Sequence, residues 1–283
     1  MNPSTSDDGG HASAGSNGRN RRPCRTAGRT PAPRRSGGRE SGAALAARGA
    51  AVARRLAETY PRADCSLRFR SPFQLLIATI LSAQCTDKRV NAVTGTLFRR
   101  WPTPAALAAA RRPDVESAIR STGFFRAKAR SVIGCCQALV DRHAGRVPRE
   151  LEPLVKLPGV GRKTANVVLG SAFGIPSGVV VDTHVGRISR RLGLTRHTDA
   201  VRAERDLAAV VPREHWIAFS HRLIEHGRTI CTARSPTCET CPLADLCPRI
   251  GMAAMGRLPR HRVQSAASSV PHPPGRHRRG TRA

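Results

Sequence analysis

Residues 157–166 read Leu-Pro-Gly-Val-Gly-Arg-Lys-Thr-Ala-Asn, which is the pattern of a tight turn between two helices. Pro158 ends the first helix, and Gly159 and Gly161 permit positive φ and a close backbone approach. A second helix begins at about Arg162, and its first N–H groups lie free at the positive end of the helix dipole. Such a turn can hold a phosphate without reading a base. An ordinary corner between two helices is the alternative for the same pattern.

The sequence on both sides of this turn is helical. Ser71-Pro72 predicts an N-cap followed by Pro at the first helical position, and apolar residues then recur at helical spacing from Phe73 to Leu81. Thr103-Pro104 repeats the same start signal. No segment alternates apolar and polar residues over the length of a strand, and the apolar run 179–181 is too short. We therefore predict an all-α fold, with further helices near 87–100, 113–121, 125–143, 162–173, 184–192, 199–210 and 213–226.

The charge balance of the chain favours a polyanionic partner. Its 283 residues include 48 Lys and Arg against 19 Asp and Glu, a formal net charge of +29, and nucleic acid is the polyanion that such a balance most often serves. No apolar run is long enough to span a membrane, and the N-terminus lacks the apolar segment of a secretory signal. Nine cysteines are too few for a disulfide scaffold of this length. We expect a cytoplasmic protein in a reducing environment.

Both ends of the chain are basic and poor in apolar periodicity. Residues 1–42 are rich in Gly, Ser, Pro and Arg, and residues 251–283 hold seven Arg and no acidic residue. Such segments bury too little apolar surface to offset the entropy cost of ordering. We predict two disordered basic tails around a folded region at 43–250, which is itself strongly basic.

Lysine is rare in this sequence. The basic residues are Arg except at Lys88, Lys128, Lys156 and Lys163, so a Lys indicates a position where charge alone does not suffice. Lys163 lies in the first turn of the helix that follows the glycine turn. Positive neighbours there favour the neutral, nucleophilic amine, which can form a Schiff base with a sugar aldehyde carbon, whereas Arg cannot. Phosphate binding is the alternative role for Lys163.

A second candidate for chemistry follows 19 residues later, in Val-Val-Val-Asp-Thr-His at 179–184. Asp182 precedes a helix and can serve as its N-cap. Its carboxylate can also stabilise positive charge on a sugar and help to activate the nucleophile. His184 is a candidate for DNA contact or for simple packing.

Four cysteines fall within seventeen residues with the spacing C-x6-C-x2-C-x5-C. Two local disulfides are unfavourable in a reducing compartment. Structural zinc usually takes two short-spaced pairs, whereas this loop has one short pair with a wider step on each side. A [4Fe–4S] cluster accepts such a loop, and we predict it ahead of zinc. The ligands would be Cys231, Cys238, Cys241 and Cys247.

Taken together, the glycine turn, Lys163, Asp182 and the cysteine loop resemble bacterial endonuclease III, a DNA glycosylase and AP lyase of the helix-hairpin-helix superfamily. The resemblance extends from about residue 45 to 248 and strengthens the prediction of a [4Fe–4S] cluster. It implies two helical domains with a DNA cleft between them. The six-helix barrel with the hairpin would be 65–175, and the iron–sulfur domain would join 43–64 to 176–250.

The resemblance also implies roles for individual residues. Lys163 and Asp182 would be catalytic, acting on oxidised pyrimidines and abasic sites in double-stranded DNA by a lysine Schiff base and β-elimination. Gln84, in Leu-Ser-Ala-Gln-Cys-Thr-Asp at 81–87, would enter the gap in the duplex, and Phe124 would be an apolar wedge while the nucleotide is flipped out. Phe124 is larger than the aliphatic wedge expected there. The predicted DNA contacts are Gln84, Phe124, Leu157, Gly159, Gly161, Arg162, His184 and Arg234.

Three other functions share part of this pattern. A MutY-type adenine glycosylase lacks the nucleophilic Lys and uses a Glu on the helix at 72–84, where this chain has none. A non-catalytic helix-hairpin-helix module would bind DNA without needing both Lys163 and Asp182. An 8-oxoguanine glycosylase would lack the four-cysteine loop. We predict the bifunctional enzyme, acting as a monomer at the nucleoid of a bacterium.

Overall fold

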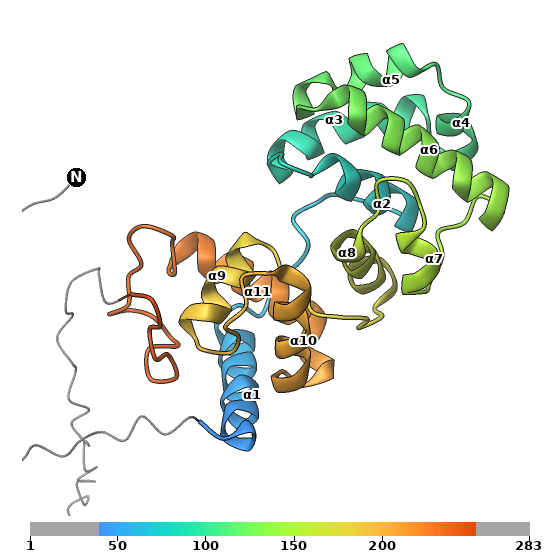
Figure 1. Cartoon of the computed structure of the whole chain (residues 1–283). Helices are drawn as coiled ribbons and strands as arrows, with labels where there is room; N and C mark the ends of the chain where they lie inside the picture. Colours follow the sequence, from blue (N-terminus) through green and yellow to red (C-terminus); the bar gives the residue numbers. More distant parts are fainter. Residues whose placement is uncertain (1–39, 253–283) are drawn as a thin grey trace, which may run out of the picture. The chain divides into compact units, whose positions relative to one another are not determined.

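The computed structural model describes residues 40–252. Within that range the chain forms eleven α-helices, two short 3₁₀-helices and no β-strand (Figure 1). The all-α prediction is therefore confirmed. The predicted tails lie outside the described residues, apart from 40–42 and 251–252.

The helices follow the predicted segments closely. Their bounds are α1 Gly42–Thr59, α2 Pro72–Leu81, α3 Asp87–Arg100, α4 Pro104–Ala108, α5 Arg112–Ile119, α6 Phe125–His143, α7 Leu151–Val155, α8 Arg162–Phe173, α9 Thr183–Arg191, α10 Ala200–Val210 and α11 Trp216–Thr229. The 3₁₀-helices span Arg120–Thr122 and Arg213–His215. The glycine turn predicted a helix before it, and α7 is that helix, although it ends at Val155 rather than at Pro158. Its five residues carry too little periodicity to predict its bounds.

Side-chain caps explain where many of these helices begin. The hydroxyl groups of Ser71 and Thr103 accept from backbone N–H groups in the first turns of α2 and α4, and Pro follows each cap. Ser41 caps α1 in the same way, and Glu40 pairs with Arg48. Residues 40–42 therefore belong to the folded region, and the boundary predicted at 42 was slightly too late.

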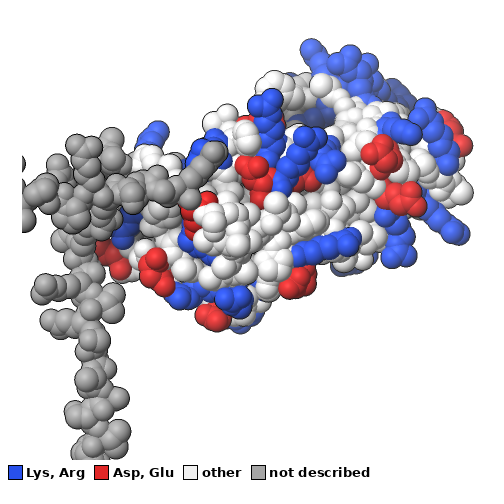
Figure 2. Space-filling model, turned by 60° about the horizontal axis from the view of Figure 1, so that its bottom comes forward, with Lys and Arg blue, Asp and Glu red and all other residues white. Residues whose placement is uncertain are grey.

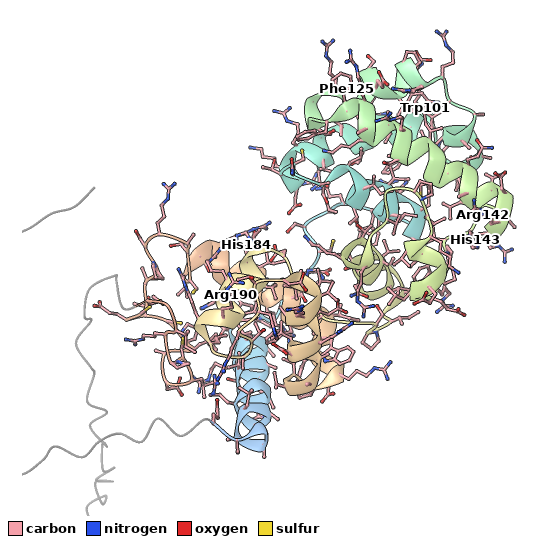
Figure 3. All side chains as sticks on the ribbon, in the orientation of Figure 1. Trp101, Phe125, Arg142, His143, His184 and Arg190 are labelled. Carbon is pink, nitrogen blue, oxygen red and sulfur yellow. The ribbon has the colours of Figure 1, made fainter. Side chains whose placement is uncertain are left out.

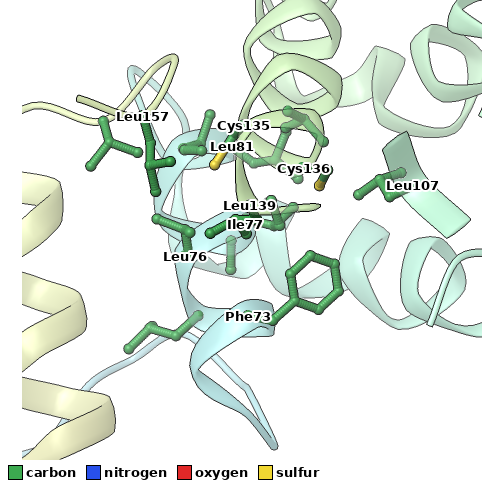
Figure 4. Close-up of a cluster of buried hydrophobic side chains, with 14 of the residues drawn as sticks. Phe73, Leu76, Ile77, Leu81, Leu107, Cys135, Cys136, Leu139 and Leu157 are labelled. Carbon is green, nitrogen blue, oxygen red and sulfur yellow. The ribbon is translucent and has the colours of Figure 1, made fainter. Parts of the chain in front are cut away.

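One hydrophobic cluster is built from the middle of the chain. Its buried side chains run from Leu67 to Leu169, and α2 packs against α3, α6 and α8 within it. Residues 75–81 on α2 are at most about 9 % exposed, so this helix is enclosed on all sides. Figure 4 shows Leu76, Ile77 and Leu81 of α2 pointing among the side chains of neighbouring helices.

A second cluster joins the two ends of the described region. It contains Val52 and Leu56 of α1 together with buried side chains from Val179 to Leu243. α1 packs against α10 and α11, and α9 packs against α11. The cysteines at 231, 241 and 247 pack against this second cluster.

Candidate functional site

One large pocket is lined by residues from both hydrophobic clusters. Its volume is about 760 Å³, which is large enough for a small ligand or a nucleoside. Lys163, Asp182, Gln84 and His184 all line it. Predicted residues from three separate segments of the sequence are thus brought to one cavity.

Lys163 reaches this pocket from the first turn of α8. The backbone at Gly159 has φ +76°, as the glycine turn requires, and a Cβ there would lie 2.6 Å from the Cβ of Ser131. Gly161 instead has φ −94°, in the extended region, and precedes α8 without any side-chain cap. An uncapped start leaves the first N–H groups of α8 available to an anion.

Asp182 serves as the N-cap of α9. Its Oδ1 accepts from the N–H of Val185 at 2.8 Å, while Oδ2 lies 3.3 Å from His184 Nδ1. The carboxylate is mostly buried, with 18 % of the side chain exposed, but it still lines the pocket. The capping role predicted for Asp182 is confirmed, and one carboxylate oxygen is bonded only to His184 at a long distance. Figure 3 labels His184 at the start of α9.

Two exposed residues, one after α2 and one before α6, have unusual backbones. Gln84 has φ +51° and Phe124 has φ +48°, and neither is glycine. Left-handed conformations of non-glycine residues are uncommon and cost free energy. The Phe124 side chain is 67 % exposed. These are the same two residues that the sequence singled out for insertion into DNA.

Two predicted DNA contacts are engaged within the protein, and their contact with DNA stays a prediction. The Arg162 guanidinium donates Nε and Nη2 to the buried Glu204 carboxylate at 2.9–3.1 Å, so α10 orients it while 43 % of its side chain stays exposed. Leu157 is 3 % exposed, and its N–H and C=O are both bonded within the turn. Leu157 therefore packs in the core and has no donor for a phosphate. Arg234 is exposed in the loop between Cys231 and Cys238.

The four cysteines of the loop line a single cavity together with Ile188, Leu192 and Leu243. None of the four forms a disulfide. Among the described residues, no group of three or more His, Cys, Asp or Glu side chains is placed as the ligands of a single metal ion. Four thiols that line one cavity are a donor set that an iron–sulfur cluster takes.

The surroundings of these sulfurs also fit an iron–sulfur cluster. Arg191 Nη1 donates to Cys231 Sγ at 3.2 Å, and His226 Nε2 lies 3.6 Å from Cys241 Sγ. Burial raises the pKa of Cys241 to about 11. A bound cationic metal is what deprotonates such a thiol, and hydrogen bonds to sulfur are a usual feature of cluster sites.

The visible face of the described region carries many basic side chains. Figure 2 shows Lys and Arg side chains across the visible face of the described region, with fewer acidic residues between them. No helix in residues 40–252 has the length and apolar character needed to cross a membrane.

The fold and sites together define a class of DNA repair protein. Residues 77–213 match the model of the HhH-GPD superfamily of base excision DNA repair proteins, and residues 231–247 match the iron–sulfur binding domain of endonuclease III.

Individual relatives narrow this class to one family. The chain is 56 % identical to endonuclease III of Synechocystis over 193 residues, which is 68 % of this chain and 88 % of the relative. Against endonuclease III of Escherichia coli K12 the identity is 44 %, covering 68 % and 91 %. A solved structure of a trapped endonuclease III–DNA covalent intermediate is 47 % identical, with a TM-score of 0.67 over 70 % of this chain and 93 % of that one. The chain belongs to the endonuclease III family, and it binds a [4Fe–4S] cluster.

Several residues of these sites carried no signal in the sequence. Three of them contact partners 15 to 42 residues away along the chain, and no local pattern marks such pairs. They are Glu204, Arg191 and His226. Two further residues that line the large pocket, Cys65 and His221, lie in no motif. Lys128 did carry one signal, the rarity of lysine in an arginine-rich chain.

Proposed function

We propose that this protein removes oxidised pyrimidines from double-stranded DNA and cleaves the resulting abasic site by β-elimination. It binds DNA and is a base excision repair glycosylase and AP lyase, as its family membership establishes. The observation that carries the proposal is the pocket shared by Lys163 and Asp182. A protein 47 % identical to this chain has been trapped as a covalent intermediate with DNA, which supports nucleophilic catalysis here.

Lys163 is the nucleophile in this proposal. Its neutral amine attacks C1′ of the flipped nucleotide, the N-glycosidic bond breaks, and the base leaves with the bonding electrons and is protonated. The attached amine then loses a proton and the C1′–O4′ bond breaks, which opens the sugar ring and leaves an imine between Nζ and C1′. This imine makes the C2′ proton acidic. Loss of that proton expels the 3′ phosphate, and water then hydrolyses the imine to free the lysine.

Asp182 assists this chemistry while it caps α9. Its Oδ2 faces only His184, so it can accept a proton from the lysine or stabilise positive charge on the sugar. His184 orients the carboxylate and contacts the DNA at the rim of the pocket.

The remaining contacts divide into two kinds. Gln84 and Phe124 enter the duplex, a role supported by their exposure and their left-handed backbones. The hairpin at Gly159 and Gly161 binds phosphate through backbone N–H groups, and Arg234 adds a phosphate contact from the cysteine loop. Arg162 acts indirectly, by holding α8 against Glu204.

The cluster and the domain organisation complete the proposal. Cys231, Cys238, Cys241 and Cys247 hold the [4Fe–4S] cluster, which folds the loop that carries Arg234. The two hydrophobic clusters are the cores of two domains, 65–175 and 43–64 with 176–250, and the DNA lies against the pocket that both line. The enzyme acts as a monomer in the bacterial cytoplasm, at the nucleoid.

Borohydride trapping tests the lysine chemistry. We would incubate the cluster-loaded protein with a duplex that carries one oxidised pyrimidine, and separately with an abasic duplex, and compare wild type with Lys163→Gln. The exposed Lys156→Gln is the matched control, since it removes a lysine seven residues away along the chain. A covalent adduct that only Lys163→Gln loses is the expected result.

The other outcomes separate the alternatives. Base release from wild type without an adduct would mean a glycosylase that does not use a lysine Schiff base. Neither adduct nor release, even with the abasic duplex, would mean a module that binds DNA without catalysis.

A further inference from the structure

Lys128 is the one buried lysine among the four in the sequence. It is 4 % exposed, whereas Lys88, Lys156 and Lys163 are exposed. It lies in the first turn of α6, four residues after Phe124. Neither the proposed chemistry nor the proposed phosphate contacts uses this side chain.

Lys128 bonds to the turn before α6 on both sides of Gly123. Its Nζ donates to the carbonyl oxygen of Thr122 at 2.8 Å, and its backbone N–H donates to the carbonyl oxygen of Phe124 at 3.0 Å. Thr122 is itself fixed, because its hydroxyl donates to the carbonyl of Ile119 at 2.8 Å. The Lys128 side chain thus fixes the carbonyl immediately before the glycine, while its backbone N–H makes the ordinary first helical hydrogen bond of α6.

The turn that Lys128 holds is strained. Gly123 has φ +70° and ψ 158°, a region open almost only to glycine, and Phe124 follows with φ +48° and ψ 27°. A Cβ on Gly123 would meet nothing within 4 Å, so backbone conformation rather than crowding requires glycine here. Two such residues in succession persist only where the surroundings hold them. The result is a phenyl ring that is 67 % exposed.

The position of Lys128 is unfavourable for stability alone. Burying an ammonium costs desolvation free energy, and the positive end of a helix dipole repels a cation. Burial accordingly lowers the pKa of Lys128, although the nearby Cys85 opposes this shift. Cys85 follows Gln84, which is another non-glycine residue with positive φ. Lys128 therefore lies near both segments that carry a proposed DNA-inserting side chain.

We propose that Lys128 is a positioning residue that holds the Thr122–Phe124 turn in the conformation that presents Phe124 to the DNA stack. This inference rests on the proposed insertion of Phe124. The Nζ hydrogen bond fixes the turn before DNA binds, so the entropy cost of ordering the turn does not weaken insertion. A buried ammonium on a flexible stem fits this role, whereas a guanidinium is larger and planar, which accounts for a Lys in an arginine-rich chain.

The test measures insertion directly. The duplex carries a tetrahydrofuran abasic analogue, with 2-aminopurine in the opposite strand, whose fluorescence rises when the base is unstacked. Wild type, Lys128→Met, Phe124→Ala and the double variant are compared, and each is also assayed for single-turnover cleavage of an abasic duplex. Lys88→Met, which removes an exposed ammonium from α3, controls for the loss of one charge.

We expect Lys128→Met to reduce both the fluorescence rise and the cleavage rate about tenfold, the scale of one hydrogen bond from a charged donor. The double variant should be no slower than Phe124→Ala, because both changes remove the same contact. The Tm of Lys128→Met should stay near that of wild type, since Met fills the space and no buried charge remains. A merely structural lysine would lower Tm and leave the fluorescence response of the folded protein unchanged.

The outcomes distinguish the insertion role of Phe124 from the positioning role of Lys128. A wild-type response from Phe124→Ala would remove the wedge role and this inference with it. A loss in Phe124→Ala but not in Lys128→Met would overturn the role of Lys128 alone. Gly123→Ala strains the same turn and leaves the lysine unchanged. If Lys128→Met fails to fold, this variant tests whether the conformation of the turn controls insertion. A wild-type fluorescence response from Gly123→Ala would then refute the inference.

Discussion

Replacing Glu204 by Ala should destabilise the protein through one buried hydrogen-bond network. The Glu204 side chain is 8 % exposed and accepts from Arg162 and from Asn166 Nδ2, the latter at 3.0 Å. Asn166 is 2 % exposed and would lose the partner of a buried donor, which costs about 1–3 kcal/mol. Arg162 is 43 % exposed and can be hydrated again, so the full cost of breaking a buried pair does not apply. A loss of about 1–3 kcal/mol in the free energy of unfolding follows.

Thermal denaturation followed by circular dichroism measures this loss. For a protein of this size a change of 1 kcal/mol moves Tm by about 2–4 °C, so Glu204→Ala should lower Tm by roughly 2–12 °C. Glu58→Ala is the control, because Glu58 is 72 % exposed and lies 3.9 Å from Arg55, a surface pair worth less than about 1 kcal/mol. Equal Tm values for the two variants would refute the network as a source of stability.

Three further predictions address the turn, the cysteine loop and a pocket histidine. Gly159→Ala should lower stability by about 1–3 kcal/mol, because its φ is +76° and the new Cβ would lie 2.6 Å from Ser131; Gly161→Ala, with open space around it, should keep the wild-type Tm. Cys238→Ser should lose bound iron and the visible absorbance of the cluster, measured by iron analysis and spectroscopy. Burial lowers the pKa of His221 below its usual 6.5, so below pH 6.5 the unfolded chain takes up a proton that the folded protein does not. The free energy of unfolding should therefore fall as pH drops from 7 to 5 in urea titrations, and less so in His221→Gln.

Much of the fold could be predicted because its signals are local. Ser71 and Thr103 cap helices through bonds to residues three positions away, and such short-range contacts are written in the sequence itself. Glycine turns, helical periodicity and the spacing of four cysteines are equally local. The sequence alone therefore determined the all-α class, the helix–turn–helix, the family and the iron–sulfur loop.

Only the tertiary structure decided what several of these residues do. The sequence suggests Arg162 as a phosphate contact. The structure shows that its guanidinium bonds to Glu204 of α10, which is 42 residues away along the chain. Leu157 looked like part of a DNA-binding turn, but packing against the hairpin core buries it. Lys128 was marked only by the rarity of its type, and its role depends on burial against the turn before α6. The physical reason is the same in each case, because burial and long-range hydrogen bonds exist only after the chain has folded and local patterns do not encode them.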